Sequence, residues 1–241
     1  MRPENLLLAA LPPDTLARFR RHLRAVDLPT GRVLHRADQL IEDVYFPLDC
    51  MISVTVTTAE GRTAEAGAVG SREMVGVNAF MGGRETNQTE YMTQIPGSAL
   101  TMLAGPLLAE FDTVKAVRDV FLRYTQAYIA QLSQNVACNQ LHQIEQRLAR
   151  WLLECRERLR ADDLSITHEF LGQMLGVRRA GVSETAGKLQ DRGLIRYTRK
   201  HVRVVDPAGL GAVACGCYQA LRDEYDRLLG PVLRTPVASR P

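Results

Sequence analysis

The segment from Leu164 to Asp206 constrains the fold of this chain more than any other. Its pattern predicts two short helices joined by a tight turn, followed by a two-stranded β wing. The expected inward-facing residues are Phe170, Leu171, Met174 and Leu175 on the first helix and Val182, Ala186 and Leu189 on the second. Gly176 and Gly193 follow the two helices, where a left-handed residue ends a helix without strain. This arrangement is typical of domains that insert their second helix into the major groove of DNA.

The polar face of the second helix, from about Arg178 to Arg192, is the expected DNA contact. With the cap of the first helix and the wing included, the candidate contacts are Thr167, Arg178, Arg179, Gly181, Ser183, Glu184, Lys188, Arg199, Lys200 and Arg203. We expect Arg179 and Glu184 to read bases, because an Arg donates two hydrogen bonds to guanine and a carboxylate accepts one from cytosine. Lys188 and the basic wing residues suit phosphates, which position a protein without specifying sequence.

Charge is unevenly distributed along the chain. Residues 1–138 contain 13 Lys/Arg and 15 Asp/Glu, a net −2, whereas residues 139–205 contain 13 and 8, a net +5. Positive charge on the helix-turn-helix portion is what binding to a phosphate backbone requires. The alternative for this segment is a solvated helix-loop-helix in another α/β protein. The helix lengths, the glycine positions and the basic wing agree with one another and favour DNA binding.

The region before the helices, residues 1–113, is rich in β-strand signals. Strands are expected at residues 32–35, 44–47, 51–57, 63–67, 90–95 and 98–102. Turn signals such as Glu60-Gly61 and Pro96-Gly97 separate them. Short strands at this spacing predict a sandwich or jelly roll, which would form a sensor domain.

A long helical region follows, because residues 114–159 contain neither Pro nor Gly. Apolar residues recur there at heptad-like spacing, which predicts a dimerisation helix over residues 114–138 with a hinge near Asn139. The expected dimer interface is Phe121, Leu122, Thr125, Ile129, Leu132 and Val136. The alternative is that both apolar stripes of this helix cover the chain's own sheet. The DNA-binding domain would then span residues 139–218, with a C-terminal helix and a disordered tail over residues 219–241.

In this order of parts, the chain resembles the Crp/Fnr superfamily of bacterial transcription regulators from about Leu6 to Tyr218. The most similar segments are VYFP at 44–47, VGSREMVG at 69–76, and the helix-turn-helix itself. The resemblance implies an α+β fold, in which a cyclic-nucleotide-binding-like β roll (jelly roll) precedes a long dimerisation helix and a winged helix-turn-helix. It also implies a homodimer that binds inverted-repeat promoter sites on double-stranded DNA, with RNA polymerase as a partner and a small-molecule effector at the roll.

The chain departs from the family where cyclic AMP would bind. Family members that bind it hold the phosphate with a Gly-Glu pair and a later Arg. Here Val77 follows Gly76, and Asn87 stands near the position of the Arg. A phosphodiester needs such donors and a compensating charge, so we expect no tight binding of cyclic AMP. Arg72 and Arg84 are weak candidates for contacting another anionic effector, and the sequence does not identify that effector.

No other cofactor is expected from the sequence. The five cysteines are Cys50, Cys138, Cys155, Cys215 and Cys217. They show no CxxC spacing and no N-terminal cluster, which argues against an iron–sulfur cluster. Cys215-Gly-Cys217 is the one suggestive pair, but buried apolar thiols are the favoured interpretation and no metal site is predicted. Haem has no assignable ligand, because His22, His35 and His142 are isolated in the sequence.

Motifs of enzymes and membrane proteins are missing from the sequence. It contains no GxSxG, P-loop or HExxH, so we do not expect an enzyme. A constitutive DNA-binding protein with a vestigial sensor domain is the main alternative. A cupin-like metal enzyme is a weaker one, since residues 47–140 lack histidine. No apolar run reaches the roughly 18 residues of a membrane span, and the first residues lack a secretory pattern, so we expect a cytoplasmic protein.

Overall fold

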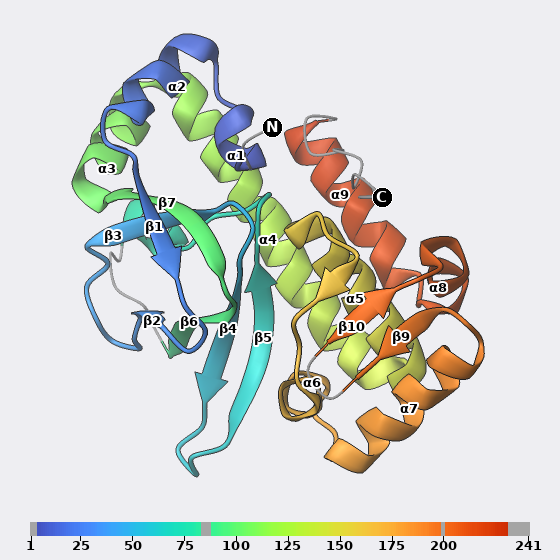
Figure 1. Cartoon of the computed structure of the whole chain (residues 1–241). Coiled ribbons are helices and arrows are strands. Elements are labelled where there is room, and N and C mark those ends of the chain that lie inside the picture. The colour runs from blue at the N-terminus through green and yellow to red at the C-terminus, as the bar shows by residue number, and fades with distance from the viewer. Residues whose placement is uncertain (1–3, 83–87, 199–200, 231–241) are drawn as a thin grey trace.

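The computed structural model describes residues 4–82, 88–198 and 201–230 of the chain. A β roll lies at one end of the molecule, the long helix α4 (Lys115–Leu141) crosses its middle, and a helix-turn-helix with a β wing lies at the other end (Figure 1). The predicted α+β fold, with a β roll before the long helix and the winged helix-turn-helix after it, is therefore confirmed.

The roll consists of two antiparallel sheets, with strand orders β1-β7-β3 and β2-β6-β4-β5. Its strands are β1 (Arg24–Leu28), β2 (Val33–His35), β3 (Asp43–Pro47), β4 (Met51–Thr57), β5 (Thr63–Val69), β6 (Thr89–Ile95) and β7 (Gly97–Leu103). Its helices are α1 (Leu6–Ala9), α2 (Pro13–Arg20), the 3-10 helix η1 (Val77–Phe80) and α3 (Ala104–Thr113). Every predicted strand is present. β1 was not predicted, because most of its side chains are exposed and show no apolar alternation.

Helix α4 is fastened to the roll by aromatic side chains. The ring of Phe121 lies 6.2 Å from that of Phe19 and 5.5 Å from that of Phe80, measured between centroids. The hydroxyl of Tyr124 donates to the carbonyl of Met74 at 3.0 Å and accepts from the amide of the same residue at 3.1 Å. The aromatic stripe of α4 therefore belongs to the core of the roll.

The long helix ends later than predicted. α4 continues to Leu141, and the chain becomes extended at His142 before α5 (Ile144–Leu159) begins. The backbone amide of Gln143 donates to Oε1 of Gln146 at 3.1 Å, which caps the start of α5. The break between the two helices therefore lies at His142 and Gln143, three residues after the predicted hinge near Asn139.

The C-terminal part contains the helix-turn-helix, the wing and two further helices. Its elements after α5 are β8 (Asp163–Leu164), α6 (His168–Leu175), α7 (Arg179–Asp191), β9 (Ile195–Tyr197), β10 (Val202–Val204), α8 (Pro207–Val213) and α9 (Cys217–Leu229). The sheet order is β8-β10-β9, so the wing has three strands rather than the two predicted. β8 is only two residues long and carries no recognisable pattern. α9 packs along α4 (Figure 1). The tail predicted to be disordered begins at Gly230, and its residues 231–241 lie outside the described residues.

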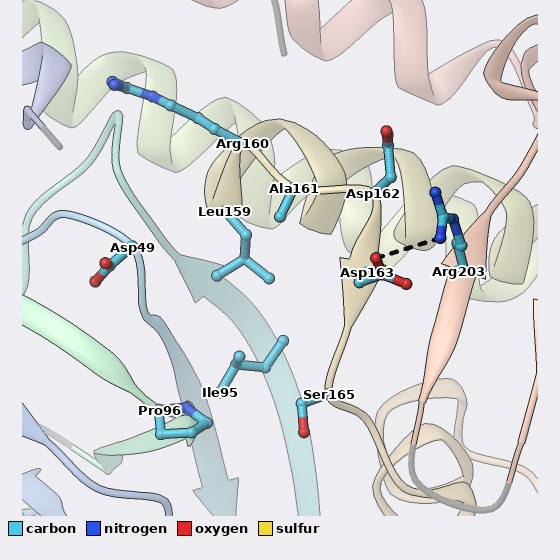
Figure 2. A pocket seen from close by; sticks show the side chains of 10 residues that line it. All are labelled: Asp49, Ile95, Pro96, Leu159, Arg160, Ala161, Asp162, Asp163, Ser165 and Arg203. Carbon is cyan, nitrogen blue, oxygen red and sulfur yellow. Dashed lines mark ion pairs between the residues drawn. The ribbon is translucent and has the colours of Figure 1, made fainter. Parts of the chain in front are cut away.

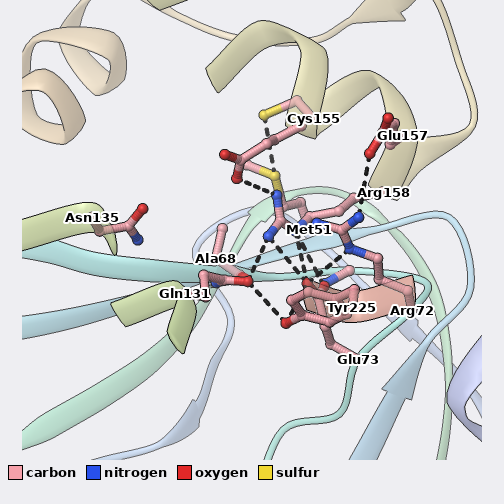
Figure 3. Close-up of polar contacts among 12 residues, drawn as sticks. Met51, Ala68, Arg72, Glu73, Gln131, Asn135, Cys155, Glu157, Arg158 and Tyr225 are labelled. Atoms are coloured by element: carbon pink, nitrogen blue, oxygen red, sulfur yellow. Dashed lines mark hydrogen bonds and ion pairs between the residues drawn. The ribbon is translucent and has the colours of Figure 1, made fainter. Parts of the chain in front are cut away.

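The roll and the DNA-binding part are packed against each other. Met51, Ala68 and Ile95 of the roll share one apolar cluster with α5, the helix-turn-helix and the wing. Beside this cluster lies a set of buried charged groups, which Figure 3 shows. The two parts therefore form one continuous interior in this conformation.

Arg158 of α5 is the centre of these buried charges. Its Nε lies 3.1 Å from both carboxylate oxygens of Glu73, which belongs to the loop after β5. Its other nitrogens donate to Glu154 at 2.7 Å and to Oε1 of Gln131 at 2.8 Å. The hydroxyl of Tyr225 on α9 donates to the same Gln131 oxygen at 3.0 Å. This Arg158 cluster connects the roll, α4, α5 and α9.

Candidate DNA interface

The cap of α6, the two glycines and the apolar stripes that predicted the helix-turn-helix all have the structural roles expected of them. Oγ1 of Thr167 accepts a hydrogen bond from the amide of Phe170 at 3.3 Å, which caps α6. Gly176 after α6 has φ = +65° and Gly193 after α7 has φ = +72°, so each takes the left-handed conformation that glycine favours. The stripes predicted to face inward on the two helices are buried. The turn thus sets α7 across α6 through features visible in the sequence.

Gly172 is a further determinant of the turn that the sequence analysis missed. Its carbonyl accepts from the amide of Val177 at 2.9 Å. A Cβ added to Gly172 would lie 3.0 Å from the carbonyl oxygen of Val177 and 3.9 Å from Cγ2 of Val182. The turn backbone therefore approaches the middle of α6 so closely that a side chain at Gly172 would press against it. A glycine inside an apolar helical pattern was the available signal.

The outer face of α7 is exposed, and it lies on the side of the molecule away from the roll (Figure 1). Of the predicted contacts on or near this helix, those with exposed side chains are Thr167, Arg178, Arg179, Ser183, Glu184 and Lys188. Gly181 is half-buried, and an added Cβ there would meet no atom within 4 Å. The backbone of α7 is therefore open to a close ligand at this point.

Glu184 and Lys188 are paired with each other on this face. Oε1 of Glu184 and Nζ of Lys188 are 2.8 Å apart, one helical turn from each other, and the two side chains are 70% and 58% exposed. The ammonium of Lys188 lowers the pKa of the Glu184 carboxyl. Exposed pairs of this kind are weak because water screens them, so either group can exchange its partner for DNA.

The cationic side chains of the wing differ in whether a nearby carboxylate offsets their charge. NH1 of Arg203 on β10 is 3.9 Å from a carboxylate oxygen of Asp163 on the neighbouring β8, so its charge is partly offset. Arg199 and Lys200, also predicted to contact phosphates, lie outside the described residues. Arg196 on β9 is exposed and stands opposite Arg203 in the ladder. The sequence analysis missed Arg196, although the alternation of β9 places it on the outer face.

The residues predicted for a dimer interface fall on two different faces of α4. Phe121 is 0% exposed and Thr125 is 6% exposed, and the Thr125 hydroxyl donates to the carbonyl of Phe121. Assigning these two to the interface was wrong, because the chain's own core covers them. Leu132 is half-buried, and a Cβ on Gly67 would lie 3.0 Å from its Cδ2. The exposed members are Leu122 at 49%, Ile129 at 53% and Val136 at 61%.

These three exposed apolar residues are seven positions apart, so they form one straight row on α4. Gln126, Ser133 and Gln140 are also exposed and lie between and beyond them at spacings of four and three. We call these six residues the α4 seam. It has an apolar row and a polar row, which is the pattern of a coiled-coil contact with polar residues at one of the two core positions.

Arg72, the candidate effector contact within the described residues, does not form an anion site. Arg72 is buried, and its guanidinium pairs with Glu73 at 3.3 Å and with Glu157 of α5 at 3.2 Å. It also lies over the ring of Tyr225, 4.4 Å from the centroid. Predicting Arg72 as an effector contact was wrong, because its guanidinium is taken up by Glu73 and by partners on α5 and α9. Arg84 lies outside the described residues.

A cleft separates the edge of the roll from the end of α5 and β8. It has a volume of about 530 Å³, and Figure 2 shows the side chains of Ile95 and Leu159 approaching each other inside it. Its polar lining combines the carboxylates of Asp49, Asp162 and Asp163 with the guanidinium groups of Arg160 and Arg203. This mixed charge does not select one class of ligand.

No helix in the ranges that the structure describes is both long enough and apolar enough to cross a lipid bilayer.

Residues 146–213 match the Crp-like helix-turn-helix domain family. Over 208 residues the chain is 21% identical to a CRP-like cAMP-activated global transcriptional regulator of Mycobacterium tuberculosis, covering 83% of this chain and 92% of that protein. Over 193 residues it is 24% identical to the transcriptional regulatory protein btr of Bordetella pertussis, covering 77% and 78%.

Solved structures show the same fold. FixK2 from Bradyrhizobium japonicum is 14% identical with a TM-score of 0.69, covering 80% of this chain and 98% of that one. A putative Crp/Fnr-family transcriptional regulator from Eubacterium rectale is 15% identical with a TM-score of 0.64, covering 87% and 99%. The Crp-like helix-turn-helix domain at residues 146–213 and the relatives named as transcriptional regulators support a DNA-binding transcription regulator, and the β roll, long helix and helix-turn-helix together have the fold of Crp/Fnr regulators.

Proposed function

We propose that this chain is a homodimeric regulator that reads an inverted-repeat promoter site, with the position of its DNA-binding part controlled through the β roll. The observation that carries the proposal is the outer face of α7, where Arg178 and Arg179 are exposed at the start of a helix whose apolar stripe is buried. Residues at the N-terminal end of a recognition helix are the ones that reach base edges.

The α4 seam supports the dimer. A side chain such as Ile129 is half exposed in the middle of a 27-residue helix, where a second α4 would cover it. Two chains related by a twofold axis present two copies of α7, and such pairs bind half-sites about one helical turn apart. The polar row of the seam would keep this contact weaker than an all-apolar one.

The Arg158 cluster supports control through the roll. The loop containing Glu73 follows β5 directly, and its carboxylate is bound to α5, the helix that leads into the helix-turn-helix. A signal that moves this loop would therefore alter how the DNA-binding part is held. We propose an effector other than cyclic AMP, since Val77 occupies the place of the phosphate-binding Glu and Arg72 is engaged elsewhere. Such a regulator would act in the cytoplasm together with RNA polymerase.

The proposal is tested by selecting bound duplexes from a random library with the purified full-length chain. The expected product is an inverted repeat whose half-sites are centred about 10–10.5 base pairs apart. Binding to it should weaken steeply with salt, because phosphate contacts release counterions. A matched control is the double variant Arg178→Glu/Arg179→Glu, which should select no sequence. Selection of an asymmetric site, or of none, contradicts the proposal.

A constitutive DNA-binding protein is the second candidate. The burial of Arg72 favours it, because no effector contact is then assigned among the described residues of the roll. Affinity for the selected duplex distinguishes the two candidates. The constitutive protein would bind equally with and without cyclic AMP, cyclic di-GMP and a panel of metabolites. A change in affinity with any of them excludes the constitutive alternative.

A further inference from the structure

Four side chains that are far apart in the sequence meet where α4 ends and α9 begins. Cys138 lies in the last turn of α4, and His142 follows its end. Cys215 precedes α9, and Cys217 is its first residue. The three sulfur atoms and one imidazole nitrogen lie within 4.8 Å of one another. The sequence analysis took His142 as isolated and predicted no metal site, because nothing in the sequence indicates that α9 folds back onto α4.

Two of the distances between these atoms are close to those of ligands around a single ion. Sγ of Cys138 and Sγ of Cys215 are 3.5 Å apart, and Sγ of Cys217 and Nδ1 of His142 are 3.6 Å apart. In a tetrahedral zinc site, with Zn–S of about 2.3 Å and Zn–N of about 2.0–2.1 Å, the corresponding separations are about 3.8 Å and about 3.6 Å. The four ligand atoms therefore need only small shifts to enclose one ion.

The surroundings suit a metal bound by thiolates. Nε2 of Gln134 donates to Sγ of Cys217 at 2.9 Å, the kind of outer hydrogen bond that orients a metal ligand. Cys217 is also at the N-terminal end of a 13-residue helix, where the helix dipole favours negative charge. Arg147 and Arg150 of α5 interact electrostatically with the sulfurs of Cys138 and Cys215. Three thiolates and one divalent cation carry a net charge of about −1, which these guanidinium groups would offset.

We propose that Cys138, His142, Cys215 and Cys217 form a structural site for one tetrahedral zinc ion, which fastens α9 to the end of α4. All four positions are supplied by the protein, and three of the four residues are buried, which is the form of a closed structural site rather than a catalytic one. The donor set of three thiolates and one imidazole is among those that zinc uses in such sites.

Two other uses of the same residues fit the geometry less well. The ligands of an iron–sulfur cluster bind different iron atoms and must stand further apart than four atoms within 4.8 Å. A disulfide between Cys138 and Cys215 would involve only two of the four residues and leave the imidazole unexplained.

The site lies where it can influence the rest of the molecule. α9 carries Tyr225, whose hydroxyl bonds to Gln131 within the Arg158 cluster. Fixing the first residue of α9 against α4 therefore also fixes the helix that reaches this cluster. The proposal does not depend on DNA binding, and its test uses none.

The test measures metal in the full-length chain purified under reducing conditions without chelator. We expect one zinc per chain by elemental analysis. After the zinc is removed, Co²⁺ should bind with one-to-one stoichiometry and give thiolate-to-cobalt charge-transfer absorption with the intense visible bands of a tetrahedral ion. The variants Cys217→Ser and His142→Ala should lose the stoichiometric metal and these bands. His142 is half-buried, so this variant is expected to fold even if the cysteine variant does not.

The matched control is Cys50→Ala. Cys50 is also buried, but its thiol donates to the carbonyl of Ser98 inside the roll, so this variant should keep one zinc and the full cobalt spectrum. The proposal is overturned if the reduced parent chain gives no charge-transfer absorption with Co²⁺. It is also overturned if His142→Ala binds cobalt as the parent does, or if mass spectrometry finds a Cys138–Cys215 disulfide in place of the metal.

Discussion

Arg179 is the residue on which base recognition depends in this account. It begins α7, its side chain is exposed, and it has the fork geometry that matches guanine. Arg179→Ala should weaken binding to the selected site by about 1–3 kcal/mol and relax the preference at one position of each half-site. Fluorescence anisotropy on specific and scrambled duplexes measures both effects. Arg24→Ala, an exposed Arg of β1, is the control and should change neither, whereas equal losses on both duplexes would refute the assignment.

Gly172 and Gly187 make a matched pair for testing the turn. A Cβ at Gly172 would press against the carbonyl of Val177, whereas one at Gly187 would meet nothing within 4 Å. Gly187→Ala should stabilise the chain by about 0.5–1 kcal/mol, because alanine is the better helix former. Gly172→Ala should destabilise it despite the same propensity gain. Urea unfolding of the two variants measures the difference, and stabilisation by both would show that the close approach is not required.

Residues with local roles could be predicted from the sequence, and residues with distant partners could not. Thr167, Gly176 and the apolar stripes act within a turn or two of helix, so their pattern is sufficient. Arg72 was predicted as a candidate effector contact because its partners, Glu157 and Tyr225, are 85 and 153 residues further along the chain. The metal-site residues were missed for the same reason.

At the scale of elements, α4 was predicted as a dimerisation helix without knowledge of which faces were already occupied. Heptad spacing alone does not decide which of two neighbouring stripes of the helix forms the interface. From the sequence, Thr125 and Leu132 were predicted to lie in the interface beside the apolar row of the α4 seam. The structure instead has Gln126 and Ser133 exposed beside that row. Which stripe remains free depends on how the helix packs on the roll, and that is a tertiary property that spacing cannot reveal.

The α4 seam leads to a prediction about assembly. Ile129→Asp places a charge at the centre of the apolar row, where two facing copies would repel each other in a desolvated contact. The variant should be monomeric by light scattering, and its affinity for the inverted repeat should fall. Leu40→Asp, at a residue of the roll that is 51% exposed, is the control and should leave the dimer intact. An unchanged mass for Ile129→Asp would place the dimer contact elsewhere.

At the scale of the whole molecule, the Arg158 cluster holds the roll and the DNA-binding part in one arrangement. In this cluster and next to it, three cationic side chains form ion pairs with three anionic ones: Arg72, Arg150 and Arg158 with Glu73, Glu154 and Glu157. Gly70 is part of the fit, because a Cβ there would lie 2.5 Å from that of Arg158. Removing one member of a set of buried, paired charges leaves another charge buried without its partner, which strongly destabilises the folded state.

Arg158→Met tests this connection. It keeps most of the side-chain volume but leaves Glu73 without its main cation, which should cost about 3–5 kcal/mol. Amide hydrogen exchange should accelerate in residues 70–73 and in α9, where the cluster joins the two parts. Arg222→Ala is the control, because Arg222 pairs with Glu157 at the rim and is 39% exposed. If exchange in Arg158→Met matches that of the parent, the cluster does not hold the two parts together.

The central claim is that two copies of this chain place two copies of α7 in successive major grooves on one face of DNA. Hydroxyl-radical footprinting of the selected duplex tests it most directly. The account predicts two protected patches related by a twofold axis and separated by about one helical turn, roughly 34–36 Å. Both should disappear together in Ile129→Asp at concentrations where the parent is bound. A single patch, two unrelated patches, or protection that survives in that variant would contradict the account.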